Sequence, residues 1–139
     1  MKVHPAKVLL FPLALIFSMI HYSCRDKGIM CTEEYRMLTV SVIDSNSIPV
    51  NLGWYKVRKK STGEILDFSV EDPYMDSINR LQGIYTIFTD GKMSMTTKEG
   101  MEFEFLVMQA SLPVVLESYV IGKDDCHVLL RSGKTEIIF

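Results

Sequence analysis

Short runs in which apolar and polar residues alternate, separated by turn-forming residues, recur along most of this chain. The clearest run, MEFEFLVMQ, places Phe103, Phe105 and Val107 on one face and Glu102 and Glu104 on the other. A side-chain period of two is typical of a half-buried β-strand. Such runs return at spacings of roughly 8 to 15 residues, which is the rhythm of an antiparallel β-sandwich. The pattern predicts an all-β, Ig-like antiparallel sandwich of about seven or eight strands.

One segment, EDPYMDSINRLQG, breaks this rhythm. Asp72 is suited to cap a helix that begins at Pro73, and the glycine at the end of the segment is suited to stop it. Ile78 and Leu81 would then face the core. We expect a short helical turn near 73–82, in the connection between two strands.

The beginning of the chain has the layout of a secretory leader. Lys2 and Lys7 precede an apolar run that ends at Ile20, and this run is shorter than the roughly 20 residues of a membrane-spanning helix. A small residue and then Cys24 follow, before the polar stretch RDKG. This arrangement resembles a bacterial lipoprotein signal, which is cut before the cysteine and leaves that thiol to carry the lipid. The relaxed residues before Cys24 are similar to those of Bacteroidota lipoproteins.

The leader defines the expected domain organisation. We expect a signal peptide at 1–23, a lipid-anchored tether at 24–30 and one β-sandwich domain at 31–139. The alternative, a plain secretory signal in which Cys24 is incidental, stays open. A lipid on Cys24 would place the protein in the bacterial cell envelope, at the outer membrane or cell surface, with the membrane as its first partner.

Charge argues against nucleic acid as a partner. The whole chain carries a formal net charge of −2, and loss of Lys2 and Lys7 with the leader changes it to −4, from 13 basic and 17 acidic residues. Proteins that bind nucleic acid present a basic face to the phosphates. The one basic run, Arg58-Lys59-Lys60, is short and is typical of a solvated strand end.

The three cysteines predict a disulfide. If lipid consumes Cys24, then Cys31 and Cys126 form an even pair in an exported protein, where oxidising conditions favour a bridge. That bridge would enclose nearly the whole domain, so loop-closure entropy predicts a stabilisation of about 4 to 5 kcal/mol. Free buried thiols remain an alternative, as does a site in which Cys126 takes part in chemistry.

Cys126 and His127 form the pair on which such chemistry would depend. Neighbouring residues on a strand point to opposite faces, so the two side chains are poorly placed to hydrogen-bond each other. The chain contains neither a G-x-S-x-G elbow nor a recognisable cysteine-protease signature. A zinc site would need three or four convergent ligands. We therefore predict no catalytic residue, no metal site and no cofactor, and a protein that is not an enzyme.

Several residues opposite the predicted core face are also apolar, namely Ile84, Phe88, Leu106 and Met108. Either the segment around Ile78 covers them, or they form a surface for a partner. Both interpretations stay open.

Two stretches resemble the transthyretin-like domains that occur as carboxypeptidase-regulatory-like modules. VSVIDSNSIPV is similar to the opening signature of that family, on Val40, Val42, Asp44, Pro49 and Val50. LQGIYTI is similar to a second element of the family, on Leu81, Gly83, Tyr85 and Ile87. The resemblance covers roughly residues 36–90. It implies a transthyretin-like β-sandwich in a small Bacteroidota-type lipoprotein of unsettled activity, and it brings no catalytic residues.

These observations favour a non-enzymatic, lipid-anchored binding or accessory module of the cell envelope, with a protein or glycan as its ligand. Trp54 is compatible with a glycan platform. One alternative is a small thiol-dependent hydrolase or redox protein that uses Cys126 and His127. Another is a structural envelope or pilus-type subunit, which self-association of the purified protein would distinguish.

Overall fold

The structure is a computed structural model that describes residues 28–139. The compact domain begins at Cys31 and continues to Phe139. The predicted leader and the predicted lipid site at Cys24 lie outside the described residues.

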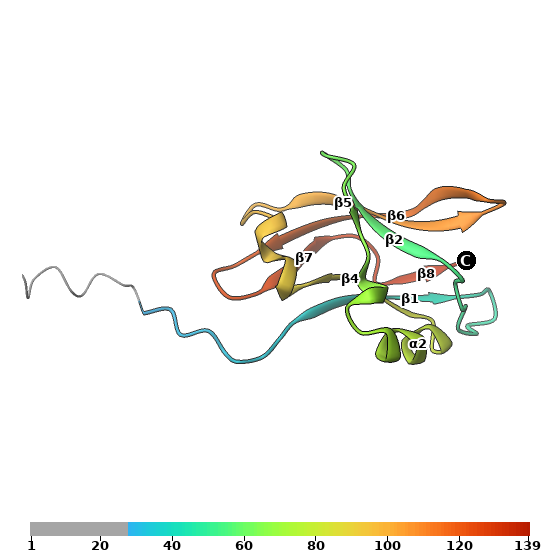
Figure 1. The fold of residues 1–139 in the computed structure, drawn as a ribbon, viewed down its shortest axis with the longest axis horizontal. Coiled ribbons are helices and arrows are strands. Elements are labelled where there is room, and N and C mark those ends of the chain that lie inside the picture. The colour runs from blue at the N-terminus through green and yellow to red at the C-terminus, as the bar shows by residue number, and fades with distance from the viewer. Residues whose placement is uncertain (1–27) are drawn as a thin grey trace, which may run out of the picture. The chain divides into compact units, whose positions relative to one another are not determined.

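The domain consists of eight strands, one α-helix and two 3-10 helices (Figure 1). The strands are β1 (Met37–Ile43), β2 (Tyr55–Lys59), β3 (Ile65–Leu66), β4 (Ile84–Thr89), β5 (Met101–Gln109), β6 (Leu112–Lys123), β7 (Val128–Ser132) and β8 (Glu136–Ile138). The helices are η2 (Phe68–Val70), α2 (Pro73–Leu81) and η3 (Asp90–Met95).

The strands form two sheets, so the prediction of an all-β, sandwich-like fold is confirmed. One sheet has the order β4-β1-β8 and the other the order β3-β2-β5-β6-β7. All pairings but one are antiparallel, and the exception is β8, which runs parallel to β1. The chain therefore crosses from the larger sheet to the smaller one after β7.

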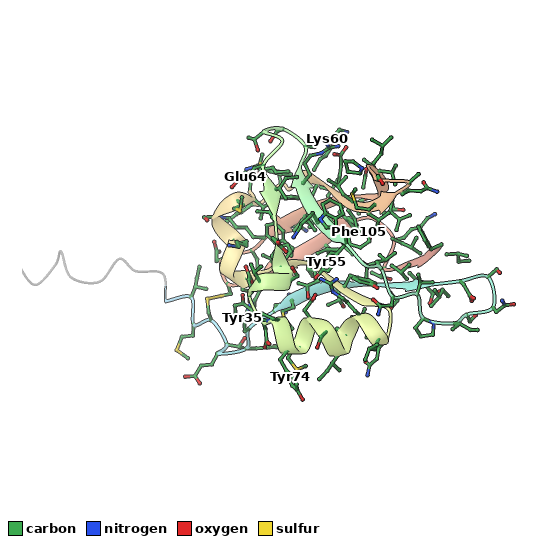
Figure 2. All side chains as sticks on the ribbon, turned by 45° about the vertical axis from the view of Figure 1, so that its right-hand side comes forward. Tyr35, Tyr55, Lys60, Glu64, Tyr74 and Phe105 are labelled. Atoms are coloured by element: carbon green, nitrogen blue, oxygen red, sulfur yellow. A yellow bond between two sulfur atoms is a disulfide. The ribbon has the colours of Figure 1, made fainter. Side chains whose placement is uncertain are left out.

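The core lies between the two sheets and is rich in aromatic side chains. Tyr85 and Phe88 of the smaller sheet meet Tyr55, Phe103 and Phe105 of the larger one, with ring-centroid distances between 4.8 and 5.9 Å. Tilted and edge-to-face pairs of this kind add to the area that each ring buries. In Figure 2, Tyr55 and Phe105 lie inside the domain, whereas Tyr74 points out from α2.

A β-bulge explains why the period of two does not hold in β4. Leu38 pairs with Phe88 but Thr39 pairs with Thr86, so Ile87 is the extra residue. A bulge of one residue bends the strand and changes the face on which the following side chain lies. Ile87 and Phe88 are consequently both fully buried.

The helix α2, Pro73–Leu81, confirms the short helix predicted near 73–82 and its start. The Asp72 carboxylate accepts a hydrogen bond from the Met75 N–H at 3.0 Å, and Pro73 is the first helical residue. The expected inner position of Leu81 is wrong, because that side chain is 71% exposed. Ile78 is half-buried.

Polar contacts hold α2 against the domain. Asp76 accepts hydrogen bonds from the Tyr55 hydroxyl at 2.7 Å and from Arg80 Nε at 2.6 Å. The Arg80 guanidinium lies 5.1 Å from the centre of the Tyr55 ring, within the range of a cation–π contact. Burial and the hydrogen bond to Asp76 together raise the pKa of Tyr55. No residue of α2 is fully buried, so the spacing of its apolar residues does not predict which side of the helix faces the domain.

Candidate functional site

Cys31 and Cys126 form a disulfide, with their Cα atoms 5.3 Å apart. Cys31 is the first residue of the domain, and Cys126 lies in the turn between β6 and β7. The bridge spans 95 residues of sequence and therefore joins the entry of the domain to its last hairpin. Cys126 then has no thiolate to act as a nucleophile.

Asp90, at the start of η3, connects three separate segments at the same end of the domain. Its carboxylate accepts hydrogen bonds from the Arg36 N–H at 2.7 Å and from the Val128 N–H at 2.8 Å. A third contact, of 2.8 Å, joins it to Nδ1 of His127. The segment before β1, the end of β4 and the beginning of β7 therefore share one carboxylate.

His127 extends this network to the segment that follows Cys31. A carboxylate can only accept, so Nδ1 of His127 carries a proton and donates to Asp90, and Nε2 of the same ring lies 3.0 Å from the Thr32 hydroxyl, within hydrogen-bond distance. His127 is 8% exposed. We call Cys31, Thr32, Asp90, Cys126 and His127 the entry latch.

Thr32, His127 and Asp90 follow the hydroxyl, imidazole and carboxylate order of a catalytic triad. Three observations indicate that these residues have a structural role here. The disulfide of its neighbour fixes Thr32 in place, and two backbone N–H groups already use the carboxylate of Asp90. The one cavity described below, beside α2, is lined by neither Thr32 nor His127.

The acids that precede Cys126 also have structural roles. The carboxylate of Asp124 accepts hydrogen bonds from the N–H groups of Cys126 and His127, at 2.7 and 2.6 Å. These backbone bonds lower the pKa of Asp124. Asp125 forms an ion pair with Lys98 on the surface. The sequence DDCH is therefore a turn that carries one half of a disulfide.

The four residues of the predicted partner surface do not share one exposed face. Phe88 is fully buried in the core because of the β4 bulge, and Leu106 is 3% exposed, so of the two interpretations left open the partner surface is wrong for these two residues. Ile84 is half-buried. Only Met108, at 41%, is largely open.

A different apolar surface surrounds Met108 near the tip of the β5–β6 hairpin. Leu112 and Val115 of β6 are 67% and 45% exposed. Met108 pairs with Pro113 and Val115 pairs with Leu106, so Met108, Pro113 and Val115 lie on one face of the hairpin, whereas Leu112 pairs with Gln109 on the other face. Pro113 is exposed as well. We call Met108, Pro113 and Val115 the hairpin patch. The sequence pattern indicated Met108 alone, because the register between the strands cannot be read from one strand.

The free edge of β6 beside the hairpin patch is protected against strand addition. β7 pairs with β6 only over residues 120–123, so residues 112–118 have an open side. Pro113 offers no N–H there, Glu117 is half-buried and charged, and the pairing with β5 shifts register after Phe105. Proline, charge and bulges are the means by which proteins prevent edge-to-edge pairing. A partner would therefore meet the side chains of this hairpin and not its edge.

Among residues 28–139, no group of three or more His, Cys, Asp or Glu side chains is arranged to hold a metal ion. In the same part of the chain, no helix is both long enough and apolar enough to cross a membrane. Comparisons with protein-family models, with curated proteins and with solved structures each gave no match. The resemblance to transthyretin-like domains therefore stays a prediction.

We predict that Asp90→Asn lowers the free energy of unfolding by about 1 to 3 kcal/mol at pH 7, because a buried set of donors loses its charged acceptor. Urea unfolding with the disulfide intact measures this. Asp125→Asn is the matched control, since it removes an exposed carboxylate with one surface ion pair, and we expect a change within about 0.5 kcal/mol. Equal effects of the two substitutions would contradict the role of Asp90.

The same variant has a predicted pH signature. Burial raises the pKa of Asp90, but the hydrogen bonds from His127, Val128 and Arg36 outweigh it, so the folded pKa lies below the ordinary value of 3.8. A carboxyl whose pKa is lower in the folded state than in the unfolded state stabilises the fold at pH values above its unfolded-state pKa. This stabilisation is lost as the pH falls through the folded-state pKa. Unfolding free energies measured from pH 5 down to about pH 2 should therefore fall less steeply in Asp90→Asn than in the wild type. Parallel curves would contradict this.

Proposed function

We propose that this protein is a lipid-anchored binding or accessory module of the bacterial cell envelope, which acts by contact and not by catalysis. The observation that carries the proposal is the pairing of Cys31 with Cys126. Of the three cysteines in the sequence, this pairing involves two, and the third, Cys24, stands at the end of a leader-like segment. The domain begins only seven residues later.

The short connection supports a function close to the membrane. A chain of seven residues spans at most about 25 Å when it is fully extended. A lipid on Cys24 would therefore keep the domain at the envelope surface, within reach of other envelope proteins. The entry latch would hold the first folded residue while the tether is pulled, because the disulfide and Asp90 both act at that end.

The hairpin patch is the surface that we propose for contact with another envelope protein. In the larger sheet, β5 continues for nine residues from Met101, close to the turn of the disulfide, to Gln109 beside the patch. Nine residues of strand cover about 30 Å. The patch thus lies at the end of the domain opposite the entry latch, where an anchored domain would present it away from its attachment.

The alternatives are less well supported. A thiol-dependent hydrolase would need a thiolate at Cys126, which the disulfide removes. A redox protein would have to open the bridge that joins the entry of the domain to its last hairpin. A structural or pilus-type subunit that assembles by strand addition would need an open edge, and the β6 edge carries Pro113 and Glu117. Purified protein that assembles into polymers would favour the structural alternative over the binding module.

We expect Cys24→Ser to abolish lipid attachment. The test is metabolic labelling with an alkyne analogue of palmitate in a bacterial host, followed by membrane fractionation and mass spectrometry. Cys31→Ser is the matched control, because it removes a cysteine of the domain but leaves the proposed anchor. The wild type and Cys31→Ser should carry the label, and Cys24→Ser should not. Label retained in Cys24→Ser would contradict the anchor.

Contact through the hairpin patch has a separate test. A photoreactive benzophenone amino acid replaces Val115 in one strain and Leu81 in another; both native residues are exposed and apolar, but Leu81 lies on α2. Irradiation of native cells should give a discrete adduct with one envelope protein at Val115 and none at Leu81. Adducts of equal yield at both positions, or none at either, would contradict the proposed contact surface.

A further inference from the structure

A half-open cavity of about 120 Å³ lies beside α2. Its lining residues come from α2 and the two residues before it, from η2, and from β1 and β4. Met37, Phe68 and Met75 give it an apolar side. A closed cavity of about 150 Å³ holds benzene, so this smaller cavity, which is open to solvent, can take in one face or edge of a six-membered ring while the rest stays outside.

Polar side chains line the rest of the cavity. Asn79 of α2 and Thr86 of β4 bring a carboxamide and a hydroxyl to its wall. Thr89 also lines it and is 2% exposed, and its hydroxyl is buried with no hydrogen-bond partner in the described part of the chain. Buried hydroxyls without a partner are uncommon in folded proteins. The Thr89 hydroxyl oxygen is covered by its neighbours, so a ligand in the cavity would meet the polar groups of Asn79 and Thr86 first.

The charges around the cavity select the kind of ligand. Three carboxylates lie in its wall, but each has a positive or donor partner. Asp76 is bound by Arg80 at 2.6 Å, Glu71 lies 3.4 Å from Lys92, and Asp72 accepts the Met75 N–H at the positive end of α2. A free cation would find these charges already compensated, and an anion would meet three carboxylates. A neutral ligand with several hydroxyl groups fits both conditions.

We propose that this cavity binds one ring of a neutral sugar. The C–H face of the ring lies against Met37 and Met75, and its hydroxyl groups hydrogen-bond to Asn79, to Thr86 and to the carboxylate oxygens of the wall. The inference goes beyond the proposed function, because it depends neither on the lipid anchor nor on the hairpin patch. Few polar contacts and an open side predict weak binding, with a Kd of about 1 to 10 mM for a monosaccharide.

Methionine methyl groups give a direct measurement. The full-length protein, labelled with ¹³C-methyl methionine, is held in a detergent without a sugar headgroup and titrated to 100 mM with D-glucose, D-galactose, D-mannose and N-acetyl-D-glucosamine. We expect at least one sugar to shift the Met37 and Met75 signals along a saturable curve. Met93 and Met95, which pack against the core elsewhere, should not move. Titrations with n-butylammonium and acetate test a cation and an anion.

Variants then locate the binding. Thr86→Val keeps the shape of the side chain but removes its hydroxyl, and we expect at least a tenfold loss of affinity. Asn79→Leu should act in the same direction. Ser77→Ala, on the exposed side of α2, is the control and should bind as the wild type does. Unchanged Met93 and Met95 signals show that each variant is folded.

Three results would overturn the proposal: no saturable shift with any of the four sugars, saturation only with n-butylammonium or acetate, or equal affinity in Thr86→Val and the wild type. None of them bears on lipid labelling or on the cross-link at Val115.

Discussion

The disulfide between Cys31 and Cys126 and the carboxylate of Asp90 act together on one end of the domain, and the remaining architecture depends on this closure. β1 is the central strand of the smaller sheet and the first strand of the chain, so its position depends on what fixes the segment before it. The bridge ties that segment to the β6–β7 turn, and Asp90 ties it to the end of β4. For a loop of about 100 residues, closure stabilises by about 4 to 5 kcal/mol, which is a large share of the 5 to 15 kcal/mol of a typical domain.

The closure uses residues that do not belong to the proposed binding surfaces. The residues that look most reactive in the sequence, Cys126 and His127, are used to hold the domain together. The surfaces that we propose for recognition are the hairpin patch and the cavity beside α2. The disulfide and Asp90 hold the N-terminal end of the domain, and the proposed contact surfaces lie elsewhere. These positions fit the proposal of a binding module that is attached through its N-terminal segment. This arrangement supports the proposed function without any catalytic group.

The sequence predicts the features that depend on local pattern. The alternation in 101–109 predicts a strand, and Asp72 with Pro73 predicts the start of α2, because both signals act over a few residues. The role of Asp90 does not follow from local pattern, because Asp90 begins η3 and distant backbone groups use its carboxylate. The burial of Phe88 does not follow from the period of two either, since the bulge in β4 arises from its pairing with β1. The roles of Thr32 and Asp90 depend on contacts across more than 30 residues, which no short pattern reports.

The number of free thiols tests the central claim most directly. The protein is exported to an oxidising compartment, purified as the fragment 25–139, denatured without reductant and treated with an alkylating reagent, and the added mass is measured. The account predicts no alkylated cysteine in a monomer, because Cys31 and Cys126 are bridged to each other. Two alkylated cysteines, with one of them modified rapidly before denaturation, would contradict it and would make the sequence DDCH a site of chemistry.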